Sequence, residues 1–266
     1  MDRMWIGSVL VAAACSMPVT QAMAAQCVKQ SPAHAVALIE LYTSEGCSSC
    51  PPADRWVSAI DRNEYGVDRV IPLALHVDYW DQLGWKDRFA SARYTQRQQS
   101  LSALTTSRVI YTPGIFLNSR EFRDWRSPAQ FQQAVRNINA QPAGADIRLE
   151  LDPAPPAKLT VKASFILKPA TRSGQPRAYV AVYENKLITD VKAGENRGVS
   201  LRHDYVVREW IGPVEINGGA AQYAGTLALD RGWIAKNLGV AAFIQDAASG
   251  EVLQATALPL CMAGSS

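Results

Sequence analysis

Cys47 and Cys50, separated by two serines, constrain this chain more than any other feature of its sequence. They follow Ala35–Tyr42, a short apolar run typical of a buried strand, and they precede Ala53–Arg62, whose apolar residues recur at helical spacing. Two prolines come directly after Cys50, and a helix tolerates proline only in its first turn. We therefore predict a helix that begins near Cys47.

A helix N-terminus favours redox chemistry of cysteines. Its free N–H groups and the positive end of its dipole stabilise a thiolate over a thiol, which lowers the pKa of the cysteine. Only the thiolate attacks a disulfide. We therefore predict that Cys47, at the exposed end, is the catalytic nucleophile, and that Cys50 resolves the mixed disulfide.

A Thr112-Pro113 pair is the second part of the predicted catalytic site, ahead of a third predicted strand at Pro113–Ser119. Cis peptide bonds in proteins occur almost only before proline. A cis-proline beside a cysteine pair leaves the backbone of the preceding residue free to pair with an extended peptide, and it hinders metal capture at that face. We predict that Thr112 and Pro113 lie beside the cysteines.

The region around these motifs supplies candidates for substrate binding. Arg69–Val77 is predicted to be a buried strand that contains His76, and Tyr79 and Trp80 follow it. Glu45 stands just before the cysteine pair. Each of these four side chains also has an ordinary structural explanation, such as a core histidine or packed aromatic rings.

The second half of the chain has a different pattern. Arg88–Leu104 and the segment capped by Ser127 are predicted helices, and they are followed by a linker-like stretch at Gln141–Ala145. About seven short alternating runs then follow, separated by Pro, Gly and Asn, which is typical of a β-sandwich. We therefore expect an α/β domain over residues 25–141 and an all-β sandwich over residues 145–262.

The first 24 residues are typical of a secretory signal peptide. Arg3 supplies the positive charge, Trp5–Cys15 is an apolar run too short to span a bilayer, and Ala22–Ala24 offers a cleavage site. We expect a mature protein that starts near Ala25, is periplasmic or secreted, and has no membrane attachment after signal removal.

Export changes the interpretation of the remaining cysteines. The mature chain keeps four of them, and an even number in an oxidising compartment suggests disulfides. Four cysteines allow three pairings. Because Cys47 and Cys50 can pair with each other, Cys27 and Cys261 are left, and we predict that they form a structural disulfide between the two ends of the mature chain.

Other interpretations of the cysteine pair remain open. It could be a structural disulfide, it could bind Cu(I) together with His76, or it could regulate docking of a partner on the β-sandwich. A closed zinc site needs four ligands, and the mature chain has no second C-x-x-C pair. We favour disulfide exchange without a cofactor, with an exported protein or a small-molecule thiol as substrate and an unidentified redox partner.

The net charge of the chain bears on which kinds of partner it can bind. The net charge is +3, which is too small to indicate binding to nucleic acid or to a membrane. Lys86–Arg126 carries eight basic residues against three acidic ones. This segment indicates either a solvated helix face or a surface that attracts acidic partners.

Gly46–Cys50 matches the active-site motif of thioredoxins, Thr112-Pro113 matches their cis-proline motif, and the order of elements from Ala35 to Asn139 resembles the thioredoxin fold. The chain also resembles an uncharacterised family of bacterial exported proteins, known as a domain of unknown function, through Leu41–Asp54, His76–Trp80, Tyr111–Gly114 and Leu201–Arg208. These resemblances imply a thioredoxin-like α/β domain followed by a β-sandwich, and they imply function only by analogy.

One departure from thioredoxins concerns the residues before the motif. Thioredoxins carry a tryptophan there and a buried acid beneath the cysteines, whereas Glu45 and Gly46 precede Cys47 in this chain. A carboxylate close to Cys47 would raise the pKa of its thiol, because a negative neighbour disfavours the thiolate.

Overall fold

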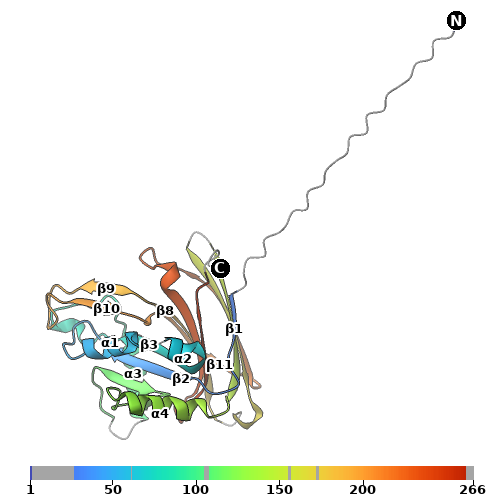
Figure 1. The fold of residues 1–266 in the computed structure, drawn as a ribbon, viewed down its shortest axis with the longest axis horizontal. Coiled ribbons are helices and arrows are strands. Elements are labelled where there is room, and N and C mark those ends of the chain that lie inside the picture. The colour runs from blue at the N-terminus through green and yellow to red at the C-terminus, as the bar shows by residue number, and fades with distance from the viewer. Residues whose placement is uncertain (2–26, 61, 105–107, 155–156, 172–173, 262–266) are drawn as a thin grey trace.

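The computed structural model describes residues 1, 27–60, 62–104, 108–154, 157–171 and 174–261. The predicted signal peptide, residues 1–24, lies outside these ranges except for its first residue. Among the described residues the protein is a mixed α/β protein with large sheets and few helices (Figure 1).

Eight strands form one large mixed sheet (Figure 1). In spatial order they are β14 (Val252–Pro259), β13 (Leu238–Asp246), β8 (Pro176–Glu184), β11 (Val206–Glu215), β3 (Val70–His76), β2 (Ala37–Thr43), β4 (Gly114–Leu117) and β5 (Arg120–Glu121). β2 and β3 are parallel along their whole length, and the helical connection between them is long enough for a parallel crossover. β11 joins β3 in parallel where Val206 pairs with Ala74.

The helices of the described residues are α1 (Pro51–Ser58), α2 (Arg62–Arg69), α3 (Ala92–Ala103) and α4 (Pro128–Asn139), with short 3-10 turns at η1 (Asp81–Leu83), η2 (Pro169–Thr171) and η3 (Ala235–Asn237). The predicted cap of α4 is confirmed, because the Ser127 side chain accepts a hydrogen bond from the Gln130 N–H. α1 begins at Pro51 rather than near Cys47, since the residues from Cys47 to Cys50 form a turn that precedes the helix.

A second sheet contains β1 (Cys27–Gln30), β6 (Ala145–Ala154), β7 (Lys158–Leu167) and β12 (Ala220–Ala228). Burial alternates along β7, because successive side chains of a strand point to opposite faces. The inward side chains of this sheet pack against those of β8 and β13 in one core, which includes Ile147, Leu149, Phe165, Val180 and Val240.

The predicted β-sandwich implied two stacked sheets built only from residues after 145. In the structure both sheets also contain strands from earlier in the chain. One sheet continues through β11 into β3 and β2, and the other takes in β1 from the N-terminal side. The edge of a strand has unpaired N–H and C=O groups that can hydrogen-bond to another strand. At this edge of β3, Ala74 pairs with Val206 of β11. Strands from both predicted domains therefore share a sheet, and the division at residues 141–145 stays a prediction.

One of the alternating runs expected to be strands comprises Leu201–Trp210, and it is divided in the structure. Tyr205 adopts a left-handed φ of 58° between β10 (Ser200–His203) and β11. β10 pairs instead with β9 (Leu187–Asp190), which the sequence did not predict as a separate strand, in a small two-stranded sheet beside α1 (Figure 1). This break positions the β9–β10 connection over the N-terminal end of α1.

Candidate functional site

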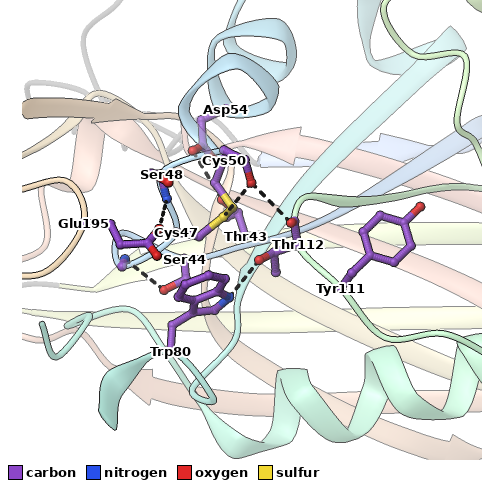
Figure 2. Close-up of a disulfide and its surroundings, with 12 residues drawn as sticks. Thr43, Ser44, Cys47, Ser48, Cys50, Asp54, Trp80, Tyr111, Thr112 and Glu195 are labelled. Carbon is purple, nitrogen blue, oxygen red and sulfur yellow. Dashed lines mark hydrogen bonds between the residues drawn. A yellow bond between two sulfur atoms is a disulfide. The ribbon is translucent and has the colours of Figure 1, made fainter. Parts of the chain in front are cut away.

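Cys47 and Cys50 form a disulfide between the end of β2 and the start of α1 (Figure 2). Their Cα atoms are 5.4 Å apart, and the Cys50 N–H donates a hydrogen bond to the Cys47 carbonyl at 3.2 Å. Both residues are 0% exposed. The expectation of an exposed Cys47 is therefore wrong for this conformation, because another part of the chain covers it.

That cover is the connection between β9 and β10, and we call residues 194–196 the strap. Glu195 accepts a hydrogen bond from the Ser48 N–H at 3.0 Å, as Figure 2 shows. Asn196 is buried and donates from its amide to the carbonyls of Glu45, at 2.9 Å, and of Cys47, at 3.0 Å. The strap thus holds the backbone on both sides of the first cysteine.

Gly194 explains how the strap can lie so close. Its φ is +72°, which glycine adopts without a steric penalty, and a Cβ at this position would lie 3.1 Å from the Trp85 Cβ. Trp85 in turn donates from its indole N–H to Glu45 at 2.8 Å. The strap was not found from the sequence, because nothing in the pattern of residues 191–199 links it to a motif about 150 positions earlier.

Asn196→Ala is expected to make the Cys47–Cys50 disulfide react about 30-fold faster with dithiothreitol. The change removes two buried hydrogen bonds of about 1 kcal/mol each, so the strap opens more often. The rate can be followed by quenching with an alkylating agent and counting the alkylated cysteines by mass spectrometry. Asn217→Ala, at an exposed turn, is the matched control. Equal rates for the two variants would contradict a covering role of the strap.

Thr112 lies on another side of the disulfide (Figure 2), and Pro113 follows it and lines a pocket together with Ser49. Their peptide bond is cis, and the Ser49 hydroxyl donates to the Thr112 carbonyl at 3.5 Å. The same Ser49 hydroxyl is 3.4 Å from the Cys47 sulfur. The two sequence motifs therefore meet, while the catalytic role of Thr112 and Pro113 stays a prediction.

The four candidates for substrate binding divide into two pairs. Trp80 is half-buried and donates from its indole N–H to the Thr112 hydroxyl at 2.8 Å, and Tyr79 donates to Gln98 at 3.2 Å. His76 and Glu45 are fully buried, so in this conformation they contact only other groups of the chain. Trp80 thus contacts the Thr112-Pro113 motif directly.

A buried ionic cluster lies below the disulfide and contains His76 and Glu45. Its other members are Asp54 on α1, Asp87 in the loop before α3, and His203 at the end of β10, and none of the five is more than 6% exposed. His203 lies between two carboxylates, with Nε2 3.5 Å from Glu45 Oε1 and Nδ1 4.0 Å from Asp54 Oδ1. The ring centroids of His203 and His76 are 5.0 Å apart.

Burial and charge oppose each other within this cluster. Burial disfavours the charged imidazolium of His76, but the Asp87 carboxylate at 2.6 Å outweighs it and raises the pKa of His76. Burial also opposes ionisation of Asp87, yet His76 prevails and lowers the pKa of Asp87. The two side chains therefore form a buried ion pair.

Asp54 behaves in the opposite way. Burial raises the pKa of Asp54, against the attraction of His203 and His76. Its carboxylate accepts a hydrogen bond from the Thr43 hydroxyl at 3.2 Å. Asp54 thus keeps its proton to a higher pH than an exposed carboxyl does, one helical turn beyond Cys50. The sequence motif contained Asp54 and Glu45, but only the fold shows that both acids are buried beneath the cysteines.

The copper-binding interpretation required Cys47, Cys50 and His76 to face one ion. Both sulfurs are joined in the disulfide, and His76 Nδ1 is engaged by Asp87. Among the residues that the structure describes, no three His, Cys, Asp or Glu side chains form a group suited to a metal ion. In this oxidised state the three side chains do not make a copper site.

Cys27 and Cys261 form the other disulfide of the described residues, which is the pairing predicted from the sequence. Their Cα atoms are 5.8 Å apart, and 234 positions separate them in the chain. Cys27 belongs to β1 and Cys261 follows β14 closely, so the bridge fastens the second sheet to the edge of the large one.

The fold and the disulfides define a mixed α/β protein in which a covered disulfide precedes the first helix. Among the described residues, every helix is too short or too polar to cross a lipid bilayer. The chain belongs to the family described as "Protein of unknown function (DUF1223)", whose model matches residues 38–245.

Solved structures support the same fold. A crystal structure of a protein from Agrobacterium tumefaciens is 26% identical, with a TM-score of 0.61 over 88% of this chain and 98% of that chain. HBP35 of Porphyromonas gingivalis is 15% identical, with a TM-score of 0.63 over 86% of this chain and 76% of that one, which is a likeness of fold alone. None of the curated proteins matches this chain in sequence.

Proposed function

We propose that this protein is an exported, thioredoxin-like thiol–disulfide oxidoreductase that works through Cys47 and Cys50. The observation that carries the proposal is a disulfide at the start of α1 with Ser49 in contact with both the Cys47 sulfur and the Thr112 carbonyl. The order of β2, α1, β3, α3, β4, β5 and α4 along the chain, with β2 and β3 parallel and β4 antiparallel, agrees with that fold.

The proposed reaction transfers two electrons between pairs of thiols. A substrate thiolate attacks the Cys47 sulfur, the Cys47–Cys50 bond breaks, and Cys50 leaves as a thiolate that takes up a proton. The second substrate thiolate attacks the substrate sulfur of this mixed disulfide and releases Cys47. The substrate dithiol loses two electrons and two protons, and the cysteine pair gains them. A second thiol–disulfide partner reverses the change.

The surroundings of the disulfide favour a working pair over a structural one. Polar groups without a hydrogen-bond partner, among them Glu45 Oε1 and both ring nitrogens of His203, lie in the ionic cluster beneath it. Buried unpaired polar atoms cost stability, so a purely structural crosslink gains nothing from them. The predicted signal peptide and the disulfide at Cys27 and Cys261 fit an oxidising compartment, and we propose that the protein acts in the periplasm or outside the cell.

Incubation of the mature protein in glutathione buffers of graded ratio tests this function. We expect the Cys47–Cys50 pair to equilibrate with the buffer while Cys27–Cys261 stays oxidised, with rates that differ about 100-fold or more. The reduced pair should also reduce a peptide disulfide in stoichiometric amount. Alkylation followed by peptide mapping reads both results. Equal resistance of the two disulfides, with no exchange onto the peptide, would reject the oxidoreductase.

A further inference from the structure

A pocket of about 380 Å³ opens beside the disulfide. Ser49 and Pro113 belong to its lining, and the Ser49 hydroxyl is 3.4 Å from the Cys47 sulfur, which is itself buried. Trp125, Arg123 and Arg126 also line it. The pocket therefore offers an aromatic surface and two cations beside Ser49, the neighbour of the proposed reacting sulfur.

The cations of this pocket are not equivalent. Arg123 forms an ion pair with Glu121 at 2.9 Å, and the Tyr111 hydroxyl donates to the same carboxylate. The Arg126 guanidinium lies 4.2 Å from the centre of the Trp125 ring and is exposed. Among the ion pairs of the described residues, none involves Arg126. Asp124 is exposed nearby but does not line the pocket.

The other side of the disulfide carries the opposite charge. Glu195 of the strap accepts from the Ser48 N–H, and its carboxylate is exposed there. In this covered conformation an arginine therefore lies on the pocket side of Cys47, and a carboxylate lies on the strap side. This polarity discriminates between acidic and basic residues that flank a substrate cysteine.

We propose that the pocket binds an acidic side chain next to the reacting cysteine of an exported polypeptide, with Arg126 as the residue that selects it. This inference rests on the proposed oxidoreductase function. An extended segment advances about 3.4 Å per residue, so a residue one or two positions from the substrate cysteine reaches the pocket. Val109, Ile110 and Tyr111 continue the surface as exposed apolar side chains, which suits a polypeptide better than a small thiol.

The experiment compares model peptides that differ only beside their disulfide-bonded cysteine. Each peptide carries Glu, Ala or Lys, two positions before or two positions after that cysteine, and its exchange rate with the reduced protein is measured. We expect Glu on one flank to react about fivefold faster than Lys, and this preference to shrink in 0.5 M salt. Glu on the other flank should bring no gain, because it lies away from Arg126.

Arg126→Ala should abolish the preference for Glu, and Arg126→Lys should keep part of it. Arg136→Ala, an exposed arginine of α4 outside the pocket, is the matched control and should leave the preference unchanged. Equal rates for the Glu, Ala and Lys peptides would overturn the pocket while leaving the oxidoreductase intact, whereas no exchange with any peptide would reject the oxidoreductase itself. An equal loss of the preference for Glu in Arg136→Ala would show a general effect of net charge. That result would overturn the role of the pocket.

In the same experiment, glutathione disulfide is compared with the peptides as a small-molecule substrate. It carries carboxylates but no extended flanking chain, so we expect it to react more slowly than the best Glu peptide and to depend less on Arg126. Faster exchange than every peptide, with the full dependence on Arg126, would overturn the assignment to a polypeptide.

Discussion

Cys47→Ser is expected to abolish disulfide exchange, and Cys50→Ser is expected to trap mixed disulfides. A serine hydroxyl cannot attack a disulfide under these conditions, so the first variant lacks the nucleophile. In the second variant Cys47 still attacks, but the neighbouring thiol that would release the substrate is absent. Cys47→Ser is therefore expected not to react, whereas Cys50→Ser is expected to stop at the mixed disulfide.

The measurement is incubation of each variant with a fluorescent peptide disulfide, followed by non-reducing electrophoresis and peptide mapping. We expect a covalent adduct on Cys47 in Cys50→Ser, and none in Cys47→Ser or in the variant with both changes. Circular dichroism controls for folding, because Cys47 and Cys50 are fully buried. Adducts on Cys50 in Cys47→Ser, with none on Cys47 in Cys50→Ser, would show that the assignment of nucleophile and resolving cysteine is reversed.

Removal of the Cys27–Cys261 bridge by two alanine substitutions is expected to lower the free energy of unfolding by about 5 kcal/mol in the chain-entropy picture. The crosslink spans 234 positions, so it restricts nearly the whole unfolded chain. It also fastens β1, which pairs only with β6 in its sheet, to the end of β14. Without the bridge we expect β1 to separate from β6 before the rest of the protein unfolds.

Urea unfolding of the variant and the wild-type protein gives the difference in free energy. The matched control replaces Cys47 and Cys50 by alanine, because that disulfide closes a loop of a few residues and is expected to contribute only about 2 kcal/mol by the same reasoning. A smaller loss for the long crosslink than for the short one would show that chain entropy does not govern the stability of this protein.

Local signals in the sequence predicted the elements around the cysteines well. The prolines after Cys50 fixed the start of α1 to within a few residues, and Ser127 capped α4 as expected. The number and spacing of the cysteines predicted the pairing of Cys27 with Cys261. These features depend on neighbouring residues or on a small number of alternatives, so one sequence is enough to infer them.

Long-range features were missed for a physical reason. Asn196 and His203 reach the site from β9–β10, and an alternating strand pattern does not show which edge the strand will join. Glu40, within the apolar run of β2, is fully buried and pairs with Arg97 of α3 at 2.5 Å. No local pattern indicates that Arg97 is its partner. Such contacts depend on the packed arrangement, which periodicity does not encode.

The pairing of β11 with β3 at Val206 and Ala74 links the two halves of the chain. A fragment that ends near residue 141 would lose β11 and leave β3 as an uncovered edge, with free N–H and C=O groups and a row of buried aliphatic side chains beside them. Such an edge is a template for association with other chains. The same fragment would lose the strap, so its cysteines would lie open in the form most prone to intermolecular crosslinking. The later half of the chain is thus expected to protect the earlier half from aggregation and from unselective oxidation of its cysteines.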